Sequence, residues 1–137
     1  MGDFASSALA LQGLDIEPVD IDIMTDEYGL LKINSALHDY KISLSGNAPS
    51  DIFDSTMSRF CISCCSVEIM SNFKIKSRLD GQWYDTHHFL QCRNMIVIGD
   101  QKIPVLPLLQ LIEMYKLMGR DKDMIKIKKI ERYLIGN

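Results

Sequence analysis

The sequence predicts one α+β domain, in which helices pack on a mixed or antiparallel sheet and a helical hairpin ends the chain. Three observations support this fold class. The chain has 137 residues, a usual size for a single domain with one core. Apolar residues make up 47% and charged residues 24%, which is ordinary globular composition. The apolar pattern has a helical period near both ends and strand-like runs between them.

The first half of the chain predicts two helices and a strand. Residues 6–13 form a short helix, for which Ser6 or Ser7 is the expected N-cap and Gly13 the end. Residues 19–24 alternate apolar and acidic side chains, which predicts a strand with two aspartates on one face. A second helix is expected over 27–38, capped by Thr25 or Asp26, and residues 45–50 have loop composition.

The second half predicts antiparallel strands and then two helices. Strands are expected over 57–62 and 66–71, with a turn near residues 63–64. Asp-Gly at 80–81 and Gly-Asp at 99–100 predict two further hairpins. Pro107 opens a helix that ends at Gly119, and Asp121 starts the last helix. We expect that helix to turn Met124, Ile127, Ile130 and Leu134 inward, and Lys122, Lys126 and Lys129 to another face.

Charge and cysteine content exclude several classes of protein. The net charge is −3 and the pI is near 5.5, which argues against a nucleic acid as the main partner. Residues 1–31 hold seven acids and no Lys or Arg, whereas residues 115–137 hold seven bases. No apolar run approaches the roughly 18 residues of a membrane span, so no membrane partner is expected. Four unevenly spaced cysteines favour a cytoplasmic, thiol-reduced protein.

Asp20 and Asp22 are the strongest candidates for chemistry. Two carboxylates on one strand face lie about 7 Å apart along the backbone, close enough to converge on one or two hard cations. The alternative interpretation is a solvated outer strand face, which needs no cation. Glu68 stands between apolar neighbours in a later predicted strand and could add a third carboxylate.

These residues resemble the signature of the nucleotidyltransferase superfamily that includes DNA polymerase beta. That signature is a Gly-Ser turn, a spacer of about a dozen residues and an Asp-x-Asp strand. Phe4-Ala5-Ser6 and Asp20-Ile21-Asp22 stand at this spacing. The resemblance is closer to small bacterial and archaeal nucleotidyltransferase-like proteins. Their C-terminal pattern is matched here by 104–106, 115–116, 119–123 and 130–131.

The resemblance implies a polymerase-beta-like core, a single domain over 1–137, and a site for metal-dependent transfer of a nucleoside monophosphate. The substrates would be an NTP and an acceptor hydroxyl or phosphate. Asp20, Asp22 and Glu68 would be the catalytic residues and would bind Mg²⁺ or Mn²⁺. The residues implied to bind the triphosphate are Ser6, Ser7, Lys116 and Arg120.

Two departures from the pattern leave an alternative function open. The glycine of the Gly-Ser turn is Ala5 here, and a methyl group takes space that a phosphate oxygen needs. The helix and strand that precede this turn in the family are absent from the residues before Phe4. The alternative is therefore a catalytically decayed nucleotidyltransferase fold that acts as a binding module for a protein partner, for example in a toxin–antitoxin pair.

Other chemistry-bearing residues have simpler interpretations. Cys61, Cys64, Cys65 and Cys92 with His87 and His88 lack the paired spacing of a zinc site, and buried apolar cysteines are the favoured interpretation. Trp83 and Tyr84 could stack on a base, but packing is favoured. A solvated helix end that pairs with Glu113 or Asp123 is an equal alternative to phosphate binding at Lys116 and Arg120.

Overall fold

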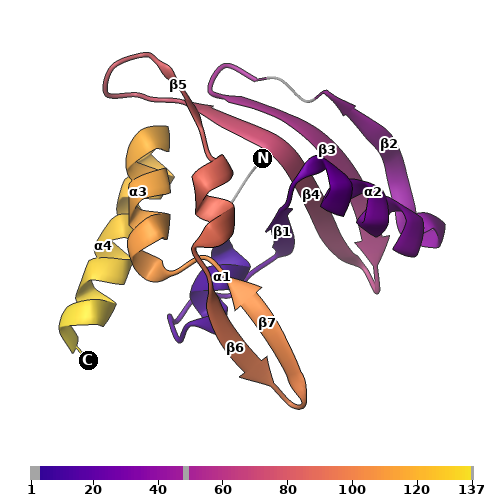
Figure 1. The fold of residues 1–137 in the computed structure, drawn as a ribbon. Coiled ribbons are helices and arrows are strands. Elements are labelled where there is room, and N and C mark those ends of the chain that lie inside the picture. The colour runs from indigo at the N-terminus through magenta and orange to yellow at the C-terminus, as the bar shows by residue number, and fades with distance from the viewer. Residues whose placement is uncertain (1–3, 48–49, 137) are drawn as a thin grey trace.

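The protein has a central mixed sheet, helices on both of its faces, and a separate two-stranded hairpin (Figure 1). The computed structural model describes residues 4–47 and 50–136. The strand order is β1-β4-β3-β2, with β5 also paired to β4. The strands are β1 (Asp20–Met24), β2 (Lys41–Asn47), β3 (Phe53–Ile62), β4 (Cys65–Lys76) and β5 (Trp83–Asp85). Among the described strands of this sheet only β1 pairs in parallel, with β4, so the sheet is mixed, which is one of the two predicted possibilities.

The helices confirm the predicted α+β order, including the C-terminal helical hairpin. They are α1 (Ser6–Leu11), α2 (Glu27–Ala36), α3 (Leu108–Met118) and α4 (Asp121–Gly136), with 3₁₀ turns at His38–Tyr40 and His87–Gln91. Asp26 caps α2 by accepting a hydrogen bond from the Gly29 amide at 2.7 Å. Gly119 ends α3 with φ 63°, a left-handed conformation that favours glycine. Within residues 4–47 and 50–136, no helix is long and apolar enough to cross a membrane.

Two clusters of apolar side chains hold the helices to the sheet. The larger lies between one sheet face and helices α1, α3 and α4, and it includes Phe4, Leu9, Met70, Met114 and Tyr115. The smaller lies under α2 on the other face and consists of Leu30, Phe60, Val67 and Ile69. Figure 1 shows α2 on one side of the sheet and the α3–α4 pair on the other.

A bulge in β4 sets which side chains face the larger core. Asn72 has φ 51°, and the pairing with β3 shifts by one residue between Thr56 and Asp54. Because of the extra residue, Met70 and Phe73 both lie in the larger core although they are three positions apart. The side-chain alternation of β4 therefore shifts by one residue between the part that contains Glu68 and the part after Asn72.

The hairpins at 80–81 and 99–100 form as predicted, and β6 (Asn94–Ile98) pairs with β7 (Gln101–Val105). The turn at Ser63 and Cys64 also forms, with positive φ at both residues. The prediction of a loop over 45–50 is wrong for residues 45–47, which belong to β2, and residues 48–49 lie outside the described part. This strand was missed because it is an edge strand with polar composition, Gly46 and two register shifts.

Candidate active site

The strand register places the predicted carboxylates in adjacent rows on one sheet face. Asp22 in β1 pairs with Glu68 in β4, and Glu68 pairs with Arg59 in β3. Side chains of directly paired residues point to the same face, so these three form one polar row. Asp20 lies in the next row, beside Ser66. The row on the other side is apolar and consists of Met24, Met70 and Met57, so the polar rows begin where the larger core ends.

The aspartate face is the more buried face of β1. Ile21 and Ile23 are 38% and 37% exposed, whereas both aspartates fall in the half-buried class. This result contradicts the interpretation of Asp20 and Asp22 as a solvated outer face. Carboxylates on the buried face of an edge strand require partners, because burial of an unpaired charge is costly.

The turn before α1 supplies one of these partners. The Ala5 amide donates a hydrogen bond to Asp22 Oδ2 at 3.1 Å, and the Ser7 hydroxyl donates to the backbone carbonyl of Asp20 at 2.6 Å. Ala5 is the N-cap, with φ 62° and ψ 21°, so the prediction that Ser6 or Ser7 caps α1 is wrong. The helix α1 therefore begins without a side-chain cap, and the left-handed Ala5 donates its own amide to Asp22.

Burial raises the pKa of Asp22 from its usual value of 3.8 to about 6. The Ala5 amide opposes this shift because it donates to the ionised form, whereas the nearby Asp20 and Glu68 charges add to it. Lys126 lowers the pKa of Asp22 by attraction. Glu68 forms an ion pair with Arg59 at 3.5 Å, and Glu68 is the more buried partner.

A divalent cation fits the two aspartates. Asp20 Oδ1 and Asp22 Oδ1 are both buried and accept no hydrogen bond from the described residues. Oxygen atoms in this state, on carboxylates that repel one another, are the ligand type that Mg²⁺ prefers. No three His, Cys, Asp or Glu side chains in the described part converge to hold a metal by themselves, so Glu68 does not join Asp20 and Asp22 in the three-carboxylate metal group that the resemblance implied. Magnesium commonly takes one or two carboxylates and completes its shell with phosphate oxygens and water.

Two neighbouring cavities lie near this site. One, of about 330 Å³, is lined by Ala5, Ser7, Asp22 and Arg93, together with apolar residues of the β6–β7 hairpin. The other, of about 480 Å³, has acidic lining from Asp26, Glu27 and Asp85, and also includes His87. Met24 and Leu90 line both cavities, which makes them neighbours.

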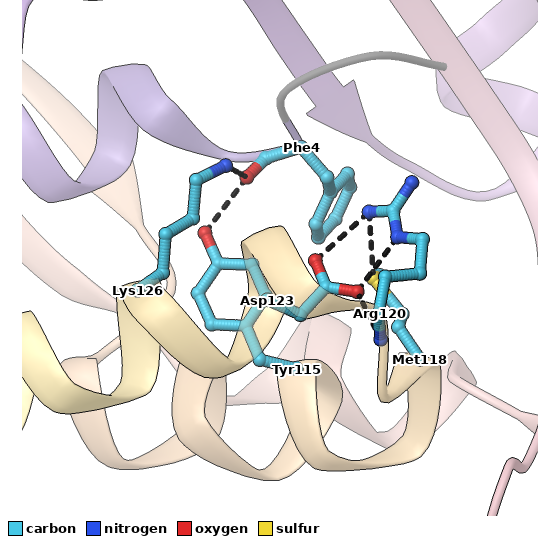
Figure 2. A network of polar contacts seen from close by, with 6 residues as sticks. All are labelled: Phe4, Tyr115, Met118, Arg120, Asp123 and Lys126. Atoms are coloured by element: carbon cyan, nitrogen blue, oxygen red, sulfur yellow. Dashed lines mark hydrogen bonds and ion pairs between the residues drawn. The ribbon is translucent and has the colours of Figure 1, made fainter.

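The remaining predicted site residues lie in different surroundings. Ser6 is buried with no partner for its hydroxyl among the described residues, and Ser7 lines the smaller cavity. Lys116 is exposed on α3. Arg120 forms an ion pair with the buried Asp123, with Nε–Oδ2 at 2.6 Å (Figure 2). Arg120 is thus held just before α4 by Asp123, as expected from the alternative in which it pairs with an acid rather than with phosphate.

The less favoured candidates are exposed. None of the four cysteines belongs to a metal-binding group in the described part, and Cys61 and Cys64 are exposed, so the expectation of buried cysteines is wrong for these two. Trp83 and Tyr84 are 47% and 39% exposed, which contradicts the packing interpretation. Tyr84 donates a hydrogen bond to Asp80 across the β4–β5 turn.

Sequence reasoning missed Lys126, which is only 6% exposed. We expected it on a face of α4 that does not point inward. Its spacing from Asp123, Ile127 and Ile130, all buried, places it on the inward stripe of the helix. That spacing is the signal that could have identified it, because a lysine on a buried stripe needs a specific partner. Met124 and Leu134, expected inward, are both 44% exposed.

Comparisons with known proteins agree with this fold. The profile of the family described as aminoglycoside-2''-adenylyltransferase matches residues 5–130. A crystal structure from Thermotoga maritima, provisionally assigned as a nucleotidyltransferase, is 27% identical, with a TM-score of 0.75. The similarity covers 97% of this chain and 80% of that one. A search among curated proteins found no match. The chain belongs to the aminoglycoside-2''-adenylyltransferase family and has a nucleotidyltransferase fold.

Proposed function

We propose that this protein transfers a nucleoside monophosphate from an NTP to an acceptor hydroxyl, with Asp20 and Asp22 as ligands of Mg²⁺. The observation that carries the proposal is the pair of buried carboxylate oxygens without hydrogen-bond partners in the described part. The match of the family profile and of the nucleotidyltransferase structure supports the reaction class. When bound, Mg²⁺ would neutralise charge on the triphosphate and lower the pKa of the attacking hydroxyl.

The smaller cavity is the proposed site of the triphosphate. It brings the Ala5 turn, Ser7 and Arg93 to the same space as Asp22. Arg93 supplies the cationic side chain among the described residues that line it. A guanidinium can hold two phosphate oxygens at once, which would fix the α-phosphorus relative to Asp22. Positioning and charge neutralisation are the main contributions of a protein to phosphoryl transfer.

The proposed chemical step is a displacement at the α-phosphorus. The acceptor oxygen forms a bond to this phosphorus, the bond to the bridging oxygen breaks, and pyrophosphate leaves with that electron pair. Glu68 is the proposed acceptor of the hydroxyl proton, because it is the cross-strand neighbour of Asp22. Arg59 holds Glu68 in the ion pair and so fixes its carboxylate in the row.

The larger cavity is the proposed site of the acceptor. Its carboxylates at positions 26, 27 and 85 favour a cationic molecule and disfavour an acceptor phosphate. An aminosugar that carries both ammonium groups and hydroxyls has the required chemistry. The family description names an aminoglycoside as the adenylyl acceptor of its members, so we propose this class of acceptor and ATP as a donor.

The experiment is a matrix of four NTPs against an aminoglycoside panel with Mg²⁺, in which pyrophosphate release and the mass of the acceptor are measured. We expect one acceptor to gain a nucleoside monophosphate in a reaction that stops when the metal is chelated. Pyrophosphate release without a modified aminoglycoside would show that the acceptor belongs to another chemical class. No release with any NTP would favour the non-catalytic binding module, for which the replacement of glycine by Ala5 is the supporting observation.

Arg93→Met should raise the KM for NTP by about 10-fold or more and leave the stability nearly unchanged. The expected size follows from the roughly 1.5–3 kcal/mol of a hydrogen bond to a charged group. Arg93 is exposed, so the loss of packing is small. Initial rates against NTP concentration measure the effect, and Arg78→Met outside this cavity is the control. An unchanged KM would remove Arg93 from the triphosphate site.

Ala5→Gly should strengthen Mg²⁺-dependent NTP binding while the stability changes by less than about 1 kcal/mol. Glycine removes the strain of the left-handed backbone at position 5, which stabilises the folded protein by about 1–2 kcal/mol. The greater freedom of the unfolded chain costs about 0.4–1 kcal/mol, and loss of the buried methyl costs about 0.8 kcal/mol. Titration with a non-hydrolysable NTP and urea denaturation measure the two quantities. Ser6→Ala in the Ala5→Gly background should weaken the binding.

The control for Ala5→Gly is Ala8→Gly, because Ala8 lines the same cavity from inside α1. A glycine in a helix costs about 0.5–1 kcal/mol, so this variant should lose stability. A stability loss at Ala5 equal to that at Ala8 would contradict a strained Ala5. Tight NTP binding by the wild type that Ala5→Gly does not change would show that the methyl leaves the phosphate site intact.

A further inference from the structure

Lys126 in α4 and Tyr115 in α3 both donate to a single backbone oxygen. Lys126 Nζ lies 3.2 Å and the Tyr115 hydroxyl 2.7 Å from the carbonyl oxygen of Phe4 (Figure 2). Both side chains are buried, and the ammonium lies 5.4 Å from the centroid of the Tyr115 ring. Burial of a lysine is costly, so its direction toward one carbonyl requires an explanation.

The peptide group that receives these two hydrogen bonds also contacts the candidate site. The carbonyl of Phe4 and the amide of Ala5 belong to the same planar unit, and that amide donates to Asp22 Oδ2 at 3.1 Å. In a trans peptide the C=O and N–H bonds point in opposite directions. A cation and a hydroxyl at the oxygen therefore fix the direction in which the amide hydrogen points, which is toward Asp22.

The backbone conformation of this turn is one that its own residue, Ala5, does not favour. Ala5 occupies the left-handed region, which alanine disfavours, and α1 has no side-chain cap. If the peptide rotated, its carbonyl oxygen would face the Asp22 carboxylate and repel it. The two donors from the helical hairpin oppose that rotation. Both are more than 100 residues away from Phe4 in the sequence.

We propose that Lys126, with Tyr115, is a positioning residue for the metal-binding carboxylate. It holds the Phe4–Ala5 peptide so that the Ala5 amide donates its hydrogen bond to Oδ2 of Asp22. The other oxygen, Oδ1, has no hydrogen-bond partner among the described residues and is left for a cation. The C-terminal hairpin would thus act on the site through this peptide group, besides the direct attraction between Lys126 and Asp22. This inference rests on the proposed function for the identity of the bound ion.

The alternative is that Lys126 contributes only to packing, and the test separates the two. The variants are Lys126→Met, which keeps most of the length without the charge, and Tyr115→Phe, which removes only one hydroxyl. Lys129→Met is the matched control, because Lys129 is exposed on the same helix. The ¹H–¹⁵N spectrum of the metal-free protein, Mn²⁺ titration calorimetry, and kcat and KM are measured for each.

Lys126→Met should weaken Mn²⁺ binding about 10–100-fold, the usual effect of losing a group that orients a metal ligand. The Ala5 amide proton should move upfield, as we also expect for Asp22→Asn, whose neutral amide oxygen is a weaker acceptor. The kcat should fall more than the KM for NTP rises. Tyr115→Phe should act in the same direction but less, which keeps the test valid if Lys126→Met folds poorly. Lys129→Met should match the wild type in every measurement.

A variant that unfolds more easily but keeps the wild-type Mn²⁺ affinity and Ala5 amide shift would overturn the proposal and leave a packing role. The amide shift is measured without metal or substrate. It therefore remains informative if the wild type transfers no nucleotide, an outcome that would contradict the proposed function alone.

Discussion

Asp22→Asn should abolish most nucleotidyl transfer and, at the same time, make the metal-free protein more stable at neutral pH. Loss of one group that stabilises developing charge typically costs about 10²–10³-fold in kcat, and we expect at least that. The stability gain has a separate cause. Burial makes the ionised Asp22 unfavourable, and asparagine removes the charge while its amide oxygen can still accept from Ala5.

The pH dependence of this gain follows from the direction of the pKa shift. Between pH 3.8 and about 6 the folded protein holds a proton on Asp22 that the unfolded chain has released. Stability of the wild type therefore falls as pH rises through this window. One pKa unit corresponds to about 1.4 kcal/mol. The free energy of unfolding of Asp22→Asn should therefore exceed that of the wild type by about 3 kcal/mol above pH 6, and by least near pH 4.

Urea denaturation of both proteins from pH 4 to pH 8 measures the effect. Asp15→Asn is the control, because Asp15 is exposed in the loop before β1 and its replacement should change little. With saturating Mn²⁺ the wild type should become more stable than Asp22→Asn, because the bound cation stabilises the wild type and not the variant. A variant that is less stable than the wild type at pH 7 without metal would show that Asp22 already has a favourable partner.

Arg120→Met should destabilise the protein by about 3 kcal/mol and leave the KM for NTP unchanged in the fraction that stays folded. Asp123 is completely buried and accepts from the side chain and the backbone amide of Arg120. Removing the guanidinium leaves a buried carboxylate whose remaining partner among the described residues is the backbone amide. Breaking a buried ion pair costs about 3–5 kcal/mol. The guanidinium carbon also lies 5.2 Å from the centre of the Phe53 ring.

The double variant Arg120→Met with Asp123→Leu provides the control. Replacement of both charges by apolar side chains should recover much of the lost stability. Lys116→Met should change neither stability nor KM, because the side chain is exposed. A raised KM in Arg120→Met at full stability would instead place Arg120 at the triphosphate, as the family resemblance implied.

The fold was largely predictable because turn and helix-end signals are local. Gly81, Gly99 and Gly119 each have positive φ at the turns and helix end where the sequence placed them. Strand β2 was not predictable, since an edge strand with polar composition has little period-two signal. The bulge at Asn72 changes the phase of β4, and no residue pattern announced it.

The candidate site was predictable in its carboxylates but not in their supports. The two aspartates spaced two residues apart are visible in the sequence. So is Glu68, a single acid in an otherwise apolar predicted strand. The hydrogen bond from Ala5 to Asp22 depends on the path of the backbone, which no residue of the turn itself announces in the sequence. Lys126 reaches Phe4 from the far end of the chain, so its role follows only from the packing of α4.

Calorimetric titration of a non-hydrolysable ATP analogue into wild type and Asp22→Asn, with and without Mn²⁺, tests the central claim most directly. The claim is that Asp20 and Asp22 bind a divalent cation together with an NTP. We expect the wild type to bind the analogue only when the metal is present, and Asp22→Asn to show no metal-dependent binding. Equal binding by both proteins, or metal-independent binding by the wild type, would contradict the claim.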